Sequence, residues 1–226
     1  MVNSAKIIMK FPLDIYEVFV IYLRGPIGYK LRYRYWKKRL KYIGKNVVIE
    51  DGVYFQKPRS ISLDDNCLID KGVIILGGPD KSNRARRYIP NKMFPLGRGG
   101  VHIGKNVHIA PYCLISGIGG IYISDNCTLS SGVKAYSLSH HYRSDEFPNI
   151  RSFGFGSCIR PENQFMIEGP IFIDKNVGVA LNSIIMPGVV IKNDSFIAIN
   201  SVVSSSFEEN SLIAGNPAKR VKERYR

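Results

Sequence analysis

The chain has 226 residues, of which 45% are hydrophobic and 22% are charged, a balance that is typical of a folded protein and excludes a wholly disordered one. The formal net charge of +14 favours an anionic partner: nucleic acid, an anionic membrane surface or a phosphorylated ligand. Four scattered cysteines argue against a disulfide framework, and no apolar stretch near the start is long enough to cross a bilayer. We therefore expect a cytoplasmic protein, which could also lie at the inner face of the cell membrane.

Residues 1–42 form the first predicted unit, with ten Lys or Arg against two acidic residues. Residues 4–24 are typical of an apolar helix interrupted near Pro12. Over residues 29–43, one helical face collects aromatic and aliphatic side chains and the other collects Arg and Lys. The apolar face comprises Tyr29, Tyr33, Trp36, Leu40 and Ile43. This segment either caps the apolar end of the following domain or makes peripheral contact with an anionic membrane. Nucleic acid is not favoured, because no recognised binding motif accompanies the charge.

An internal repeat dominates the chain from residue 43 to residue 210. Aliphatic residues recur every six positions, and the longest series is Ile173, Val179, Ile185, Ile191, Ile197 and Val203. A related phrase recurs with it, as in Ile43-Gly-Lys-Asn-Val, Leu63-Asp-Asp-Asn-Cys and Ile103-Gly-Lys-Asn-Val. A period of six fits neither an amphipathic helix nor an alternating strand. It predicts a three-sided solenoid with one inward aliphatic residue per face and coils of about twenty residues. Cys67 and Cys127 occupy equivalent places in this repeat, as small core residues.

Two insertions interrupt the repeat. The first, 77–100, is rich in Arg, Lys, Gly and Pro and is predicted to be a long loop, either for acceptor recognition or as a solvated segment. The second, 137–169, contains Ser139-His140-His141-Tyr142, followed by Asp145 and Glu146. Residues 211–226 are predicted to be a basic C-terminal tail.

Near its C-terminus, the repeat resembles the hexapeptide-repeat acyltransferases, particularly those that acetylate bacterial polysaccharides. The resemblance covers roughly residues 43–222 and is most specific in four phrases. These are Asn176-Val-Gly-Val-Ala-Leu-Asn182, Met186-Pro-Gly-Val-Val-Ile191, Ala198-Ile-Asn-Ser-Val-Val203 and Ala214-Gly-Asn-Pro-Ala-Lys219. The resemblance implies a left-handed parallel β-helix, a homotrimer, and transfer of an acetyl group from acetyl-CoA to a hydroxyl of a sugar or polysaccharide.

The resemblance also implies the site residues. The family's catalytic histidine follows a repeat coil, often in a Ser-His-x-Tyr phrase, which matches His140 and leaves His141 as the alternative. Imidazole is suited to removing the proton of a sugar hydroxyl near neutral pH. A carboxylate would orient the ring, and Asp145, Glu146, Glu162 and Glu168 are all near in sequence.

The donor is expected along the last coils, between two subunits of the trimer. Its pantetheine arm would lie against small residues such as Ala180 and Ala198, and its adenosine phosphates would meet Lys219 and Arg220. No metal is implied.

Three other functions stay open. The same base would serve an N-acyltransferase that acts on an amino sugar. A non-catalytic β-helix scaffold could use its basic ends to dock on a membrane. A metal-dependent lyase on this fold would need clustered histidines, for which His102 and His108 are the available pair.

Overall fold

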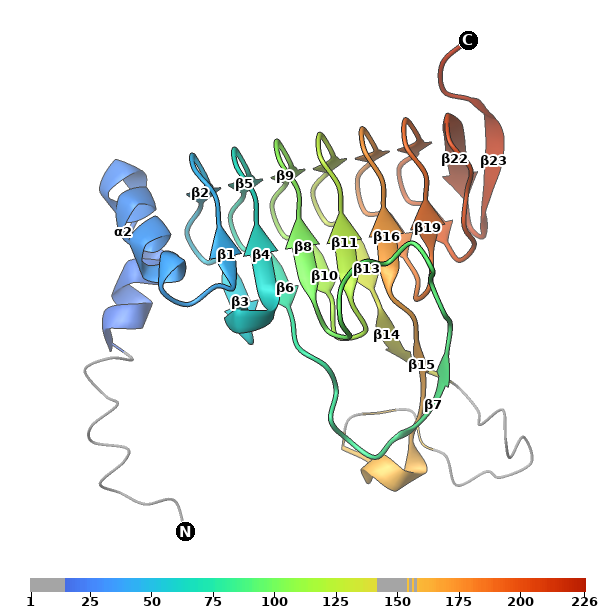
Figure 1. Ribbon diagram of the computed structural model, residues 1–226, viewed down its shortest axis with the longest axis horizontal. Helices are drawn as coiled ribbons and strands as arrows, with labels where there is room; N and C mark the ends of the chain where they lie inside the picture. The colour runs from blue at the N-terminus through green and yellow to red at the C-terminus, as the bar shows by residue number, and fades with distance from the viewer. Residues whose placement is uncertain (1–14, 142–153, 155, 157) are drawn as a thin grey trace.

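The structure is a computed structural model that describes residues 15–141, 154, 156 and 158–226. The chain winds into a left-handed parallel β-helix with short N-terminal helices, and the predicted fold class is confirmed. Successive coils stack along one axis and place three flat sheets around a common core (Figure 1).

Each sheet takes one short strand from each coil. The first contains β1 (Tyr42–Ile43), β4 (Ile61–Leu63), β8 (Val101–Ile103), β11 (Ile121–Ile123), β16 (Ile171–Ile173) and β19 (Val190–Ile191). The second contains β2 (Val48–Ile49), β5 (Leu68–Ile69), β9 (His108–Ile109), β12 (Thr128–Leu129), β17 (Gly178–Val179), β20 (Phe196–Ile197), β22 (Ser211–Gly215) and β23 (Ala218–Glu223). The third contains β3 (Tyr54–Gln56), β6 (Ile74–Leu76), β10 (Leu114–Ser116), β13 (Lys134–Tyr136), β18 (Ile184–Ile185) and β21 (Val202–Val203).

The asparagine of the repeated phrase turns one corner of each coil. Asn46, Asn66, Asn106, Asn126 and Asn176 have φ angles of 56°, 61°, 55°, 60° and 58°, a left-handed conformation that asparagine tolerates better than most residues. Their side chains also form a ladder. Asn46 donates to Asn66 at 3.1 Å, and Asn106 donates to Asn126 at 2.9 Å. The repeat therefore fixes both the turn and the stacking of coils.

The inward aliphatic residues form one continuous core. Ile69, Ile103, Ile123 and Ile173 are fully buried, as is Cys67. The Cys67 thiol donates to the Gly104 carbonyl at 3.0 Å, and burial raises the pKa of this thiol to about 12. The equivalent Cys127 is buried in the same way, so both cysteines are small core residues as predicted.

The N-terminal helices cover the first coil. The predicted helix over 29–43 has the wrong bounds: α2 spans Gly25–Lys37, and Tyr42–Ile43 form β1. Pro26 lies in the first turn of α2, where it needs no hydrogen-bond partner. Helix formation stops before Tyr42 because this residue and Ile43 pair with Ser62 and Leu63 in the first sheet. Of the predicted earlier helix, residues 15–22 are helical, and the part around Pro12 lies outside the described residues.

A buried arginine joins these helices to the solenoid. Arg32 is fully buried and donates to the carbonyls of Ile49 (2.7 Å), Val20 (3.2 Å) and Leu23. Trp36 packs edge-on against Phe55 with ring centroids 4.7 Å apart. These contacts show that α2 caps the apolar end of the β-helix.

The C-terminal segment differs from the predicted tail. Ile213 is buried and continues the aliphatic ladder, because β22 pairs in parallel with β20. The chain then reverses, and β23 pairs antiparallel with β22. Residues 211–215 are therefore part of the solenoid.

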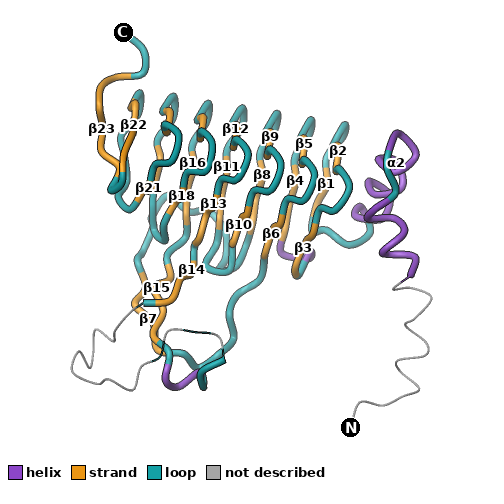
Figure 2. Tube along the Cα trace, turned by 180° about the vertical axis from the view of Figure 1, so that it is seen from behind, coloured by secondary structure: helices purple, strands orange, loops and turns teal. Residues whose placement is uncertain are grey.

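Both insertions leave the solenoid on the same side and meet there (Figure 2). They form a three-stranded sheet from β14 (Leu138–His140), β15 (Phe165–Glu168) and β7 (Ala85–Tyr88), which we call the arm. The first insertion is thus not only a loop. Within the part of the chain that the structure describes, no helix is long and apolar enough to cross a membrane.

Candidate active site

His140 is the last residue of β14 and lies against a buried glutamine. Its Nε2 is 3.1 Å from Oε1 of Gln164, which is 1% exposed. Gln164 uses its amide nitrogen to donate to the Ile159 carbonyl. Because that carbonyl can only accept, the amide oxygen must face His140 and accept a hydrogen bond from the Nε2–H group. This arrangement selects the tautomer in which Nδ1 of His140 carries the lone pair.

His141 is anchored through its backbone. Its N–H donates to the Phe165 carbonyl at 2.8 Å, and its ring meets the Phe165 ring edge-on with centroids 5.8 Å apart. Both histidines are partly buried at the end of β14, but only His140 contacts Gln164 among the contacts described.

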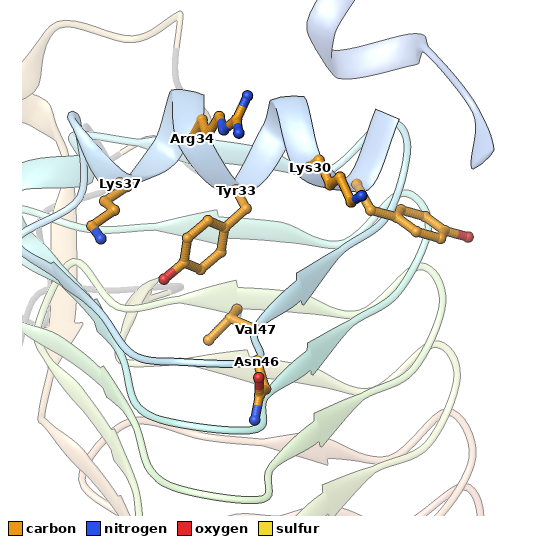
Figure 3. A pocket seen from close by; sticks show the side chains of 7 residues that line it. Lys30, Tyr33, Arg34, Lys37, Asn46 and Val47 are labelled. Carbon is orange, nitrogen blue, oxygen red and sulfur yellow. The ribbon is translucent and has the colours of Figure 1, made fainter. Parts of the chain in front are cut away.

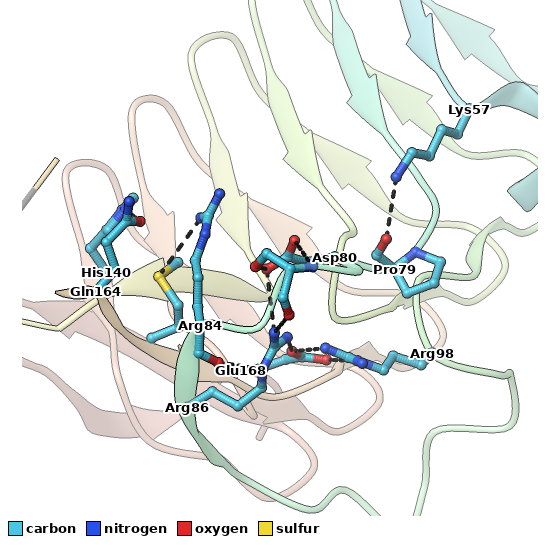
Figure 4. A network of polar contacts seen from close by, with 11 residues as sticks. Lys57, Pro79, Asp80, Arg84, Arg86, Arg98, His140, Gln164 and Glu168 are labelled. Atoms are coloured by element: carbon cyan, nitrogen blue, oxygen red, sulfur yellow. Dashed lines mark hydrogen bonds and ion pairs between the residues drawn. The ribbon is translucent and has the colours of Figure 1, made fainter. Parts of the chain in front are cut away.

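The contacts described for Glu168 are with arginines of the first insertion, and its role in orienting the imidazole stays a prediction. Glu168 is fully buried on β15, and its carboxylate receives Arg86 Nη1 at 2.7 Å, Arg98 Nη2 at 2.6 Å and Arg98 Nε (Figure 4). It lies across from Leu138 in the register of the arm, whereas His140 lies across from Met166. Both carboxylate oxygens of Glu168 accept hydrogen bonds from guanidinium groups, whereas the described partner of the His140 ring is Gln164.

The Glu168 cluster joins the two insertions. Burial alone would raise the pKa of Glu168, but hydrogen bonds from Arg98 and Arg86 and their charges outweigh it and hold the pKa below its usual value. Arg86 also donates to the Ser82 carbonyl at 2.9 Å and lies 3.5 Å from Asp80. Arg86 and Arg98 belong to the first insertion, whose cations were candidates for acceptor recognition, but both bind Glu168. The other carboxylates differ: Glu162 is exposed in the 3-10 turn Pro161–Asn163, and Asp145 and Glu146 lie outside the described residues.

Four predicted donor-binding residues lie along one corner of the last coils. The Ala180 N–H donates to the Ile197 carbonyl at 2.9 Å, so Ala180 and Ala198 occupy the same place in successive coils. Ala198 in turn donates to Ile213 at 2.8 Å, and Lys219 pairs with Ala214 in the closing hairpin. Arg220 follows, exposed and 3.7 Å from Glu223. The result is a track of small side chains that ends in cations, which fits a pantetheine arm followed by phosphates.

Within one chain, the candidate base and the donor track are apart. Strands β13 and β18 are parallel neighbours in the third sheet, where Lys134 pairs with Ile184. Ala180 lies before the start of β18, whereas His140 lies after the end of β13. The two therefore lie beyond opposite ends of the same parallel strands.

The remaining histidines have structural partners. His108 Nε2 is 2.8 Å from Asp70, and His102 stacks on Tyr122 with centroids 4.5 Å apart. Burial lowers the pKa of His102 despite the nearby Asp64. Over the described ranges, no group of three or more His, Cys, Asp or Glu side chains is arranged to hold a metal ion.

Sequence comparison finds relatives among sugar-modifying enzymes. Over 184 residues, the chain is 30% identical to a dTDP-4-amino-4,6-dideoxy-D-glucose acyltransferase of Escherichia coli. The match covers 81% of this chain and 82% of that protein. It is 29% identical over 127 residues to the putative lipopolysaccharide biosynthesis O-acetyl transferase WbbJ of E. coli K12, and the match covers 56% of this chain and 62% of that relative. No model of a known protein family matches.

Solved structures share the fold. A point mutant of AntD, an N-acyltransferase from Bacillus cereus, solved with dTDP and coenzyme A, superposes with a TM-score of 0.69 at 24% identity, covering 86% of this chain and 90% of that chain. A maltose O-acetyltransferase from Clostridium difficile superposes with a TM-score of 0.52 at 19% identity, covering 91% and 81%.

Proposed function

Because this chain belongs to the hexapeptide-repeat sugar acyltransferases, we propose that it transfers an acetyl group from acetyl-CoA to a hydroxyl of a sugar in a surface polysaccharide or its precursor. The observation that carries the proposal is the pair of His140 and Gln164 at the end of β14. A hydroxyl is a weak nucleophile at neutral pH, so its acylation needs a positioned base.

In the proposed reaction, Nδ1 of His140 removes the proton of the sugar hydroxyl as its oxygen attacks the thioester carbonyl. The new oxygen–carbon bond forms, the carbon–sulfur bond breaks, and the proton passes from His140 to the departing thiolate. Gln164 keeps Nε2 protonated in the resting ring and stabilises the imidazolium that forms in between.

The proposed donor site is the track that contains Ala180 and Ala198, with Lys219 and Arg220 at the adenosine phosphates. Its separation from His140 in one chain supports a site shared between neighbouring subunits of a homotrimer. One chain would then supply the base and its neighbour would supply the donor track.

A second candidate is N-acylation of an amino sugar, which the relationship to the E. coli dTDP-amino-sugar acyltransferase favours. An amine is the stronger nucleophile, and it would depend less on His140 than a hydroxyl does.

The test is release of the coenzyme A thiol from acetyl-CoA in the presence of hydroxyl sugars and, separately, of nucleotide-linked amino sugars. We expect transfer to the hydroxyl acceptors, with the acetyl group identified by mass spectrometry. Transfer only to the amino sugars would replace the first candidate with the second, and binding of acetyl-CoA without transfer to either class would contradict both.

A further inference from the structure

The N-terminal cap carries an exposed apolar row. Helix 15–22 buries Val20 against the solenoid, but Ile15, Val18, Phe19 and Tyr22 are between 54% and 63% exposed. Their spacing of three and four residues places them on one face of the helix. Such a face, with nothing from the described residues covering it, is costly in water unless a partner covers it.

Cations lie next to this row. Residues 15–41 contain eight Lys or Arg and one acidic residue, Glu17, which faces Tyr35. Asp51 Oδ2 lies 3.7 Å from Nε of Arg24 and balances its charge. Arg32 is buried and adds no exposed charge. Of the six other cations, Arg39 is half-buried and Lys41 is exposed beyond the helix. The remaining four are exposed on α2 and just after it, and we call them the cationic face: Lys30, Arg34, Lys37 and Lys38.

Two pockets flank α2 and combine apolar walls with these cations. One, of about 410 Å³, lies between α2 and the first coil (Figure 3). In it, Tyr33 points toward Val47, and Lys30, Arg34 and Lys37 supply positive charge. The other, of about 490 Å³, is formed by Tyr16, Leu31, Tyr35, Arg34, Lys38 and Arg39. Tyr16 comes from the helix that carries the apolar row, so this helix and the cationic face meet at the second pocket.

We propose that the N-terminal cap docks on an anionic phospholipid surface. The apolar row enters the acyl region of the bilayer, and the cationic face contacts lipid phosphates. This orientation presents one end of the solenoid to the membrane and leaves the arm and the last coils outside the contact surface (Figure 1).

The charge and the apolar row of the cap favour an anionic bilayer over a second copy of the chain and over nucleic acid. A second copy of the chain would bring a like-charged cationic face against the first, which opposes association. Nucleic acid would match the charge but leave four aliphatic and aromatic side chains in water. An anionic bilayer satisfies both features of the cap.

Co-sedimentation of the full chain with vesicles tests the proposal. We expect binding to vesicles of phosphatidylcholine with phosphatidylglycerol, loss of most binding in high salt, and weak binding to phosphatidylcholine alone. Phe19→Glu should lower the partition coefficient about tenfold or more, because it replaces an exposed aromatic side chain that would enter the bilayer with a charged one. The double variant Arg34→Gln and Lys38→Gln should lower it about thirtyfold, since each cation contributes on the order of a fivefold factor.

Matched controls lie elsewhere on the molecule. Val221→Glu changes an exposed apolar residue at the far end of the solenoid, and Lys105→Gln with Lys175→Gln removes two exposed cations from coil corners. Both should bind vesicles nearly as the unaltered chain does, and thermal melting should show that every variant is folded. Equal vesicle binding by Phe19→Glu and the unaltered chain would overturn the proposal. So would a change of oligomeric state in Phe19→Glu without loss of vesicle binding, or RNA binding stronger than vesicle binding.

Discussion

The two adjacent histidines differ in their support, and this difference gives the first prediction. His140 faces a buried amide, whereas His141 is held through its backbone and the edge of Phe165. We expect His140→Ala to lower acetyl transfer by about a hundredfold to ten-thousandfold, the range for loss of a general base. His141→Ala should cost clearly less.

The measurement is the rate of transfer to a sugar acceptor, with thermal melting to confirm that both variants are folded. A severe loss in His141→Ala with nearly normal His140→Ala would reverse the assignment. Full activity in both variants would remove histidine from the mechanism.

Gln164 gives the second prediction, as a positioning residue that acts through His140. Gln164→Ala should lower transfer about tenfold, the value of one buried hydrogen bond. Gln164→Glu places a carboxylate beside Nε2 and stabilises the protonated ring, so the pH–activity profile should move to higher pH. A purely structural role would lower the rate of Gln164→Glu without moving the profile.

The sequence could not have identified Gln164. The histidine stands out because its type is rare and its phrase resembles a known motif, but a glutamine in a non-repeating insertion has no periodic signal. Its contact with His140 depends on the antiparallel pairing of β14 and β15, which only the folded chain provides.

The same limit applies to the contacts of Glu168. Proximity in sequence suggested a contact with the histidine, but Arg86 and Arg98, which lie 82 and 70 residues earlier, occupy its carboxylate. The aliphatic period of six, by contrast, was sufficient to predict the solenoid, because each coil repeats one local rule.

At the scale of elements, the arm depends on the Glu168 cluster. A depressed carboxyl pKa means that the cluster stabilises the fold above the pKa of the unfolded state and loses this stabilisation as pH falls through the native value. Glu168→Gln should lower the free energy of unfolding of the arm by about 1–3 kcal/mol at pH 7, because it leaves two guanidinium groups without their partner. The loss of unfolding free energy stays this small because Arg98 is partly exposed and solvent screens its charge.

Hydrogen exchange of β7 and β15 measures this effect locally. The difference between the unaltered chain and Glu168→Gln should shrink as the pH is lowered, since the carboxylate becomes protonated. Glu208→Gln, which breaks an exposed pair with Lys192, is the matched control and should have little effect. Unchanged exchange in Glu168→Gln at pH 7 would show that the cluster does not hold the arm.

At the scale of the whole molecule, the shared site that we propose would make assembly of the trimer part of the mechanism. If one chain supplies the base and its neighbour supplies the track, two different inactive chains can restore a working site in a mixed trimer. We use His140→Ala for the first and Ala198→Trp for the second, because a large side chain at this partly buried corner should block the track.

Each variant alone should be inactive and trimeric by light scattering. After denaturation and joint refolding in equal amounts, random assortment should restore about one quarter of the unaltered activity, because a site works when one neighbour has His140 and the other has Ala198. Refolding of the unaltered chain under the same conditions sets the scale. No recovery in mixed trimers would place both residues of a working site in the same chain. Light scattering that shows only monomers at micromolar concentration would contradict the shared site directly, because then no neighbouring chain exists to supply the donor track.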